Sequence, residues 1–148
     1  MMDVTEIDNL ITAIVTALDG ILAYPVFDGK PEEGTPSDLT YVVIGGTLDP
    51  TEDIARMSQD WGALGRKKRD EELEIECLAV GRAARIPEAR HACIDVIEAV
   101  GALLPTNPTP LTYNTLITEV SRMQAATSQA GATVHAQFTI YSKARLLP

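Results

Sequence analysis

Apolar residues near the start of the chain recur at every third or fourth position, which is the spacing of an amphipathic helix. Thr5 stands where a capping residue is expected, and Asp8 follows three positions later, as in a capping box. Gly20 and Pro25 supply stop signals after the helix. The pattern therefore predicts a first helix whose apolar stripe comprises Ile7, Leu10, Ile11, Ile14, Val15, Leu18, Ile21 and Leu22.

A second stripe with the same spacing lies between Pro87 and Pro105. Proline is well tolerated at the first helical position, where its missing N–H has no partner to lose, and it cannot continue a helix that has already formed. The segment therefore predicts a second helix with a stripe made of Ala89, Ala92, Cys93, Val96, Ile97, Val100, Leu103 and Leu104.

The segment between the two helices predicts three strands and one long loop. Residues 24–27 have the composition of an edge strand that accommodates a proline, with Asp28-Gly29 as the turn after it. Residues 41–44 form a continuous apolar run that ends at Gly45-Gly46, as expected of a buried strand. Residues 47–68 show no sustained period, so we expect a long loop there with at most a short helical turn.

Residues 69–82 alternate strictly between apolar and polar positions, which predicts a long strand. Its apolar face carries Leu73, Ile75, Cys77 and Ala79, and its acidic face carries Glu72, Glu74 and Glu76. Two further β-like segments, residues 114–124 and 132–143, are separated by small polar residues and Gly131 and predict a hairpin.

These elements predict an α+β fold with the order α-β-β-β-α-β-β. Two helices with one apolar stripe each are best buried by a mixed, mainly antiparallel sheet of about five strands with both helices packed on one face. The other face of the sheet is then wet or covered by a partner. At 148 residues, with no internal repeat or linker, we expect a single domain spanning residues 1–148.

Composition and charge exclude several classes of protein. An apolar share of 45% with 22% charged residues is typical of a folded chain. The net charge of −9 argues against sequence-independent binding of nucleic acid, which depends on basic surfaces. The first residues are acidic and no apolar run reaches the roughly 18 to 20 residues of a membrane span, so we expect synthesis in the cytoplasm and no membrane contact.

The chain offers no arrangement that indicates catalysis, a cofactor or a metal. His91 and His135 lack the acidic neighbours of a ligand set or a triad, and on a helix His91 diverges from Cys93. Cys77 and Cys93 lie in apolar patterns without paired spacing and are expected in the core. Gly45-Gly46 lacks the rest of a phosphate-binding motif, so a strand-ending turn is the preferred interpretation.

Two groups of charged residues remain as candidates for contacts. The candidate acidic face comprises Glu72, Glu74 and Glu76. These three like charges either form a solvated face or line a pore or interface, where they would repel DNA phosphate. The basic cluster before it adjoins acidic residues and suits a head-to-tail contact between copies. With the single tryptophan, which anchors either its own loop or a neighbour, the candidate subunit or partner interface comprises Trp61, Arg66, Lys67, Lys68 and Arg69.

Four segments carry a resemblance to a known family: AYPVFDGKP, TYVVIGG, WGALGRKKRDEELEIECLAVGR and GATVHAQFTIYSKARL. In this order, with the two helices between them, they resemble the tail terminator (tail completion) proteins of long-tailed bacteriophages over nearly the whole chain. The resemblance implies a virion protein without active-site residues that forms a ring, typically of six copies, on the head-proximal end of the tail tube. There it would stop tube polymerisation and dock the head-tail connector protein, while DNA passes through without specific binding.

Three other functions stay open at this stage. One is an independent monomeric interaction module, which would be a single small species in solution at all concentrations. A head-tail connector or minor tail protein of the same virion has similar size and α+β character, and binding to the tail tube protein or to the portal side would separate the two. A small ligand-binding or hydrolytic α+β protein would need a concave apolar site with convergent polar groups.

Overall fold

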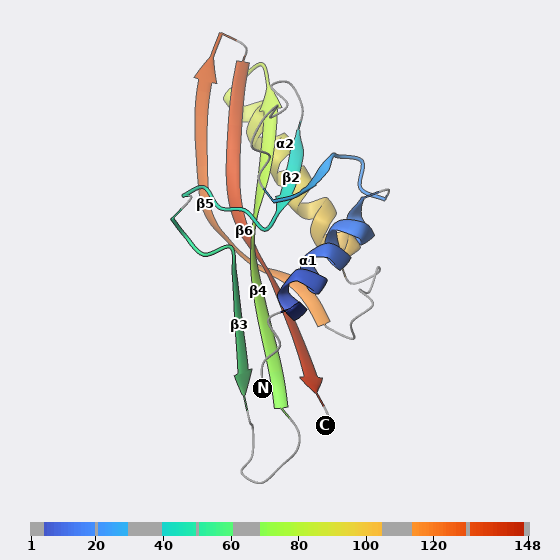
Figure 1. Cartoon of the computed structure of the whole chain (residues 1–148). Helices are drawn as coiled ribbons and strands as arrows, with labels where there is room; N and C mark the ends of the chain where they lie inside the picture. The colour runs from blue at the N-terminus through green and yellow to red at the C-terminus, as the bar shows by residue number, and fades with distance from the viewer. Residues whose placement is uncertain are drawn as a thin grey trace.

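The computed structural model describes residues 5–19, 21–29, 40–49, 51–60, 69–104, 114–129 and 131–146. Within these residues, two helices and six strands follow one another along the chain, and Figure 1 shows the strands β4, β5 and β6 running the length of the molecule. The elements are α1 (Thr5–Leu18), β1 (Val26–Asp28), β2 (Tyr41–Ile44), β3 (Ala55–Asp60), β4 (Arg69–Ala83), α2 (Ile86–Leu103), β5 (Asn114–Ser128) and β6 (Gly131–Leu146).

The strands form one mixed sheet in the order β1-β2-β4-β6-β5, and β3 pairs with β4 off this path. β1 is parallel to β2, and the other pairs are antiparallel. The predicted α+β class with a mainly antiparallel sheet is confirmed. The strand predicted at the sheet edge near Pro25 is β1, and the predicted hairpin is β5 and β6, each a few residues longer than expected.

The prediction of a continuous loop over residues 47–68 is wrong, because β3 lies within it. β2 and β3 occupy the same edge of β4: Ile44 pairs with Cys77, and Ala55 pairs with Ile75. Between them the backbone of Glu76 holds both ends of the interruption, since its carbonyl accepts from the amides of Gly45 and Gly46 and its N–H donates to the carbonyl of Ile54. β2 and β3 are thus two parts of one interrupted strand. The sequence of β3 does not predict a strand by itself, and β3 forms because the edge of the long strand β4 offers it hydrogen-bonding partners.

The segment that leaves the sheet at this interruption, residues 45–49 and 51–54 as described, is called the crossing segment below. Gly45 adopts a φ of +80°, which glycine reaches without the steric penalty of a side chain, and this lets the chain turn off the ladder. Figure 1 shows the crossing segment passing over β4 and β6 toward β5 before it returns to β3. It therefore covers part of the sheet face opposite the helices.

The main core lies between the helices and one face of the sheet. The apolar face of β4 is fully buried as predicted, and buried residues of both helices belong to the same apolar cluster. From the helices and the C-cap residue of α2 this cluster takes Leu10, Ile11, Ile14, Leu18, Ala89, Cys93, Val96, Val100 and Leu104. Helix α1 ends at Leu18, earlier than its stripe predicted, and Ile21 is 55% exposed.

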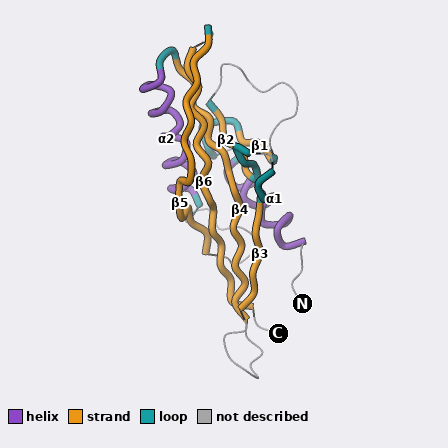
Figure 2. The backbone as a smooth tube through the Cα atoms, turned by 90° about the vertical axis from the view of Figure 1, so that its left-hand side faces the viewer, coloured by secondary structure: helices purple, strands orange, loops and turns teal. Residues whose placement is uncertain are grey.

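Helix α2 lies directly on β4 at Gly81. A Cβ atom built on this glycine would stand 2.2 Å from the carbonyl oxygen of Ala89 and 2.5 Å from the amide nitrogen of Cys93. Only a residue without a side chain fits between the strand and the helix backbone. Gly81 therefore sets how closely α2 approaches the sheet, and Figure 2 shows the helix lying along the strands.

The opposite face of the sheet has an apolar part and a polar part. The apolar part, where β4 pairs with β2, carries a small cluster of Tyr41, Val43, Leu78 and Val80, with Phe27 and Leu48 packed against it. The rings of Phe27 and Tyr41 meet edge to face with their centres 5.4 Å apart. Below this cluster the same face becomes polar, beginning at Glu76.

Candidate functional site

The basic cluster and the tryptophan predicted as an interface fall mostly outside the described part of the chain. Trp61, Arg66, Lys67 and Lys68 are not among the described residues, and Arg69 is described only as the first residue of β4. The prediction that they contact a partner therefore stays a prediction.

The predicted acidic face exists. Glu72, Glu74 and Glu76 lie on the face of β4 opposite the helices, and all three are half-buried while the alternate residues Leu73, Ile75 and Cys77 are fully buried. Across the strand pair, Glu74 lies beside Arg56 of β3. Because β3 and the crossing segment stand next to these side chains, the face is partly enclosed and not a freely solvated stripe.

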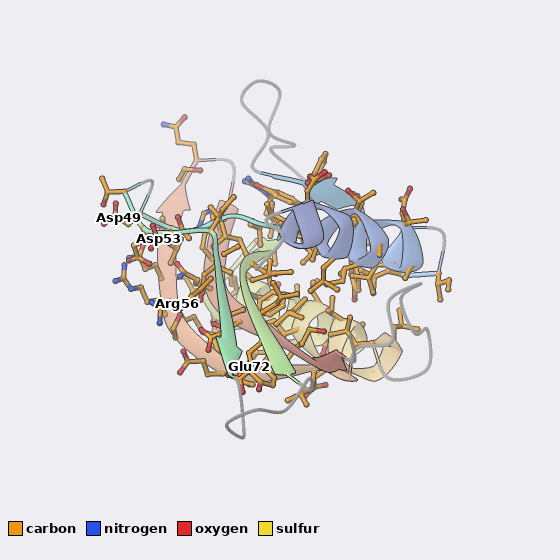
Figure 3. All side chains as sticks on the ribbon, turned by 60° about the horizontal axis from the view of Figure 1, so that its bottom comes forward. Asp49, Asp53, Arg56 and Glu72 are labelled. Atoms are coloured by element: carbon orange, nitrogen blue, oxygen red, sulfur yellow. The ribbon has the colours of Figure 1, made fainter. Side chains whose placement is uncertain are left out.

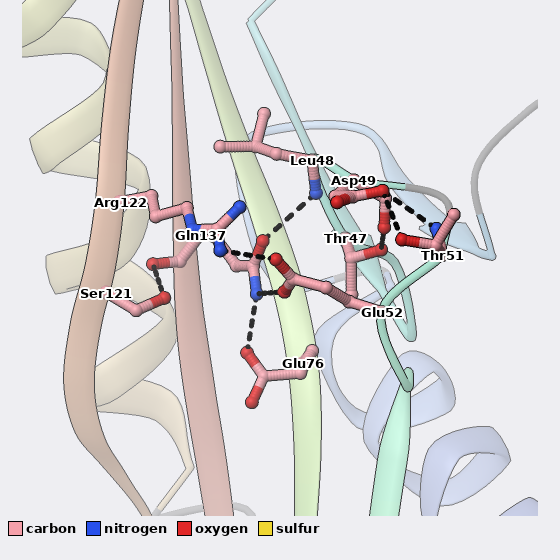
Figure 4. A network of polar contacts seen from close by, with 9 residues as sticks. All are labelled: Thr47, Leu48, Asp49, Thr51, Glu52, Glu76, Ser121, Arg122 and Gln137. Atoms are coloured by element: carbon pink, nitrogen blue, oxygen red, sulfur yellow. Dashed lines mark hydrogen bonds and ion pairs between the residues drawn. The ribbon is translucent and has the colours of Figure 1, made fainter.

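Gln137 of β6 is the centre of a polar network beneath the crossing segment (Figure 4). Its side-chain oxygen accepts from the amide of Leu48 at 3.0 Å. Its side-chain nitrogen donates to the carboxylates of Glu76 at 3.0 Å and of Glu52 at 3.2 Å. Gln137 is only 3% exposed, and its one amide group pairs with partly buried groups from β4 and from both limbs of the crossing segment.

Glu52 and Glu76 each have a second partner. Glu52 forms an ion pair with Arg122 of β5, so the crossing segment is joined to the far strand of the sheet. The hydroxyl of Thr139 donates to the carboxylate of Glu76 at 2.9 Å, which holds this carboxylate in place against the sheet. The crossing segment is thereby bound to β4, β6 and β5 at once.

The crossing segment also has local structure of its own. The carboxylate of Asp49 accepts from the amide of Thr51 at 2.9 Å and from its hydroxyl at 2.7 Å. These two hydrogen bonds favour the ionised carboxylate and lower the pKa of Asp49 below its ordinary value. The turn at Asp49 is therefore favoured near neutral pH.

An open polar groove of about 450 Å³ lies between the crossing segment and β5. Figure 3 places Asp53 and Arg56 on the side of the molecule away from α1, where the groove opens. Its lining side chains are mostly charged, and the contacts above join four of them, Glu52, Glu76, Arg122 and Gln137. The residues that line it are Thr51, Glu52, Asp53, Arg56, Glu76, Glu119, Ser121, Arg122 and Gln137.

The groove does not have the composition of a metal site. Among the described residues, no three His, Cys, Asp or Glu side chains are placed to hold a metal ion together. Four carboxylates and two guanidinium groups line it, so its surface is polar and modestly acidic. Apolar walls with a few convergent polar groups, which characterise small-molecule sites, do not describe it.

The two cysteines lie in the core, as predicted. Cys77 and Cys93 are fully buried, and the thiol of Cys93 donates to the carbonyl of Ala79 at 3.3 Å. Burial raises the pKa of Cys77 to about 12 and that of Cys93 to about 11. His91 is exposed on α2 while Cys93 is buried, so the two side chains diverge as the helical spacing predicted.

β5 presents the longest open edge of the sheet. It pairs with β6 on one side, and in the described part of the molecule no strand pairs with its other side. Its side chains from residue 116 to 128 are exposed except for Ile117, and they include Leu116 (46% exposed), Val120 (48%) and Met123 (43%). Two β-bulges interrupt it, after Ile117 and after Val120. Unpaired strand edges with apolar side chains are sites where a further strand adds.

The sequence singled out Glu76 on this side of the molecule but not Gln137, which joins it to the crossing segment. Gln137 is 85 residues from Glu52 and 89 from Leu48 along the chain, so no local pattern could indicate their contact. Gln137 fits the alternation of its own strand, so the sequence of β6 carried no signal that set it apart.

The chain matches no model of a known protein family, and no curated protein is significantly similar to it. Neither described helix is both long and apolar enough to span a membrane.

Proposed function

We propose that this protein is a structural subunit of a bacteriophage virion that forms a ring on the head-proximal end of the tail tube. In that position it ends tube polymerisation and provides the docking surface for the head-tail connector protein. Its partners are further copies of itself, the tail tube protein and the connector, and DNA passes through the ring without specific binding. The proposal joins the resemblance of four sequence segments to tail terminator proteins with the surfaces that the fold leaves open.

The open edge of β5 is the observation that carries the proposal. A monomeric protein usually protects a long edge strand with lysine, proline or a covering segment. β5 contains neither lysine nor proline, and although it has two β-bulges and the charged residues Glu119 and Arg122, three large apolar side chains on it are exposed. Such an edge suits a protein that completes its sheet by contact with another chain.

The acidic face supports the same function. Glu72 and Glu74 share the sheet face opposite the helices and lie outside the Gln137 network that engages Glu76, so a ring that turned this face toward its centre would present these two carboxylates to the DNA. Like charges repel phosphate, which lets DNA move without adhering. The net charge of −9 has the same effect at longer range.

The test is to add the purified protein to tail tube subunits during their polymerisation and to measure tube length by electron microscopy. We expect shorter tubes with a ring of added density at one end. Tubes of unchanged length with no bound protein would contradict the proposal. Binding to portal or connector assemblies instead of tubes would move the protein to the connector side of the joint.

A further inference from the structure

We propose that two copies of this chain form a twofold dimer in which their β5 strands pair antiparallel, with Val120 of one copy opposite Val120 of the other. The occupant of the open β5 edge is thus a second β5. This contact goes beyond the proposed function and describes the free protein, before another chain takes up the edge during assembly. A twofold contact closes after two copies, so it covers the edge without open-ended association.

The two edges of the sheet differ in length, which favours pairing of β5 with itself. β5 offers an edge of 15 residues. The other edge is stepped, because β1, with 3 residues, pairs with β2, whereas β3, with 6 residues, pairs with β4. Among the described strands, only a second copy of β5 presents an unpaired edge as long as that of β5.

Charge complementarity selects the register of the contact. Glu119 pairs with Thr139, and Arg122 pairs with Gln137, two positions further along β6. Both charged side chains therefore lie on the sheet face opposite the helices, and Val120 stands between them on the ladder. A twofold axis through Val120 sets each Glu119 opposite Arg122 of the other copy, which stabilises a strand pair. An axis through Glu119 or Arg122 would instead oppose like charges.

The two β-bulges of β5 fit the same axis. Thr118 and Ser121 have no partner on β6, and they lie on opposite sides of Val120. Leu116 is four residues before Val120 and three paired positions away, from 138 to 141 on β6, and Gln124 is four residues after it and three positions away, from 138 to 135. The irregularities of the two copies therefore offset each other, and the register is the same on both sides of the axis.

Apolar side chains meet on the face that carries the helices. Val120 and Met123 pair with core residues of β6, which places them on this face, yet they are 48% and 43% exposed. In the register above, the two Val120 side chains lie opposite each other, and Met123 lies opposite Ile117 of the other copy. Ile117 packs against the main core, so the contact extends this core from one copy toward the other. Removing these side chains from water favours the dimer.

The ion pair between Glu52 and Arg122 is compatible with the contact. Glu52 engages one terminal nitrogen of Arg122, and the side chain of Arg122 remains 48% exposed. A guanidinium group carries five N–H donors, so Arg122 can bind Glu52 of its own copy and Glu119 of the other at once. The dimer contact would then join the crossing segment of each copy to the second copy through Arg122.

Disulfide formation in solution, without tail tubes, tests the contact. Val120→Cys places each new thiol opposite its own copy, where antiparallel Cα atoms lie about 4.5–5.5 Å apart and a disulfide can form. Met123→Cys is the matched control, because it is similarly exposed on the same face but lies four paired positions, about 13 Å, from its own copy. Cys77 and Cys93 are fully buried and can be retained. Under mild oxidation we expect Val120→Cys to form linked dimers about tenfold faster than Met123→Cys.

Charge reversal tests the register independently. In analytical ultracentrifugation the parent protein should show a monomer–dimer equilibrium. Glu119→Arg brings two arginines together on each side of the axis and should raise the dissociation constant of the dimer about tenfold. Glu98→Arg, at an exposed position on α2, makes the same change of charge and should leave the dissociation constant unchanged.

Three results would overturn the proposed dimer. They are a parent protein that stays monomeric at every concentration tested, equal rates of dimer formation by Val120→Cys and Met123→Cys, and a dissociation constant that Glu119→Arg does not change. A dimer with the expected behaviour, from a protein that does not cap tail tubes, would uphold this contact and refute only the proposed location in the tail.

Discussion

Gly81 provides the sharpest test of the fold, because a single methyl group at this position has no space. In Gly81→Ala the new Cβ would lie 2.2 Å from the carbonyl oxygen of Ala89, 2.5 Å from the amide nitrogen of Cys93 and 2.9 Å from its Cβ. Two of these atoms belong to the helix backbone, which cannot rotate away as a side chain can. The clash can be relieved only if α2 moves off β4.

The cost follows from the packing that such a movement disturbs. Overfilling a close-packed core typically costs about 1–3 kcal/mol, and a clash with backbone atoms belongs at the upper end. About 3 kcal/mol corresponds to a fall in Tm of roughly 6–12 °C for a domain of this size. Thermal unfolding followed by circular dichroism, together with urea unfolding, measures both quantities.

Gly101→Ala is the matched control. A Cβ at Gly101, also a glycine at the packed surface of α2, would meet only Cδ1 of Ile117 at 3.5 Å, which is an ordinary contact. Alanine is the better helix former by up to about 1 kcal/mol, so this variant should be as stable as the parent protein or more stable. Equal Tm values for Gly81→Ala and the parent would refute the close approach of α2 to β4.

Two further predictions concern the polar network and the thiols. Gln137→Leu leaves the amide of Leu48 without its acceptor, so it should lower the free energy of unfolding by about 1–3 kcal/mol and accelerate hydrogen exchange at that amide. The control Gln124→Leu, at an exposed position on β5, should change the free energy of unfolding by less than about 0.5 kcal/mol. Equal effects of the two variants would contradict the role of the network. Burial raises the pKa of Cys77 to about 12 and of Cys93 to about 11, so the thiols of the native protein should resist iodoacetamide at pH 9, whereas those of the urea-unfolded chain should react fully. Because the unfolded thiols lose their protons first, the stability of the native protein should fall as the pH rises above the unfolded thiol pKa of about 9. Rapid alkylation of the native protein would refute this.

Elements with strong periodicity could be predicted from the sequence. The alternation from Leu73 to Ala79 placed the buried face of β4 correctly, and the stripe of α2 identified the residues that reach the core. In both cases burial against one neighbour imposes a regular repeat, so the pattern along the chain reports the contact.

β3 and the polar network could not be predicted in this way. The sequence of β3, ARMSQD, has little apolar alternation, and the strand forms because β4 offers it an edge that continues from β2. Gln137, Glu52 and Glu76 come from three separate segments, and their meeting depends on the path of the crossing segment. Glu76 resembles Glu72 and Glu74 in sequence, yet its backbone alone spans the interruption in the neighbouring strand.

The interruption between β2 and β3 makes the length of the crossing segment independent of the strand register of the sheet. Because the chain leaves and rejoins β4 on either side of one residue, the length of the crossing segment is not set by the register of the sheet. Insertions or deletions there would reshape the surface above β4 and β6 while every strand keeps its partner, since the entropy of closing a loop grows slowly with its length. Related chains can therefore differ in the partners that they contact through the crossing segment while they keep the same strand pairing.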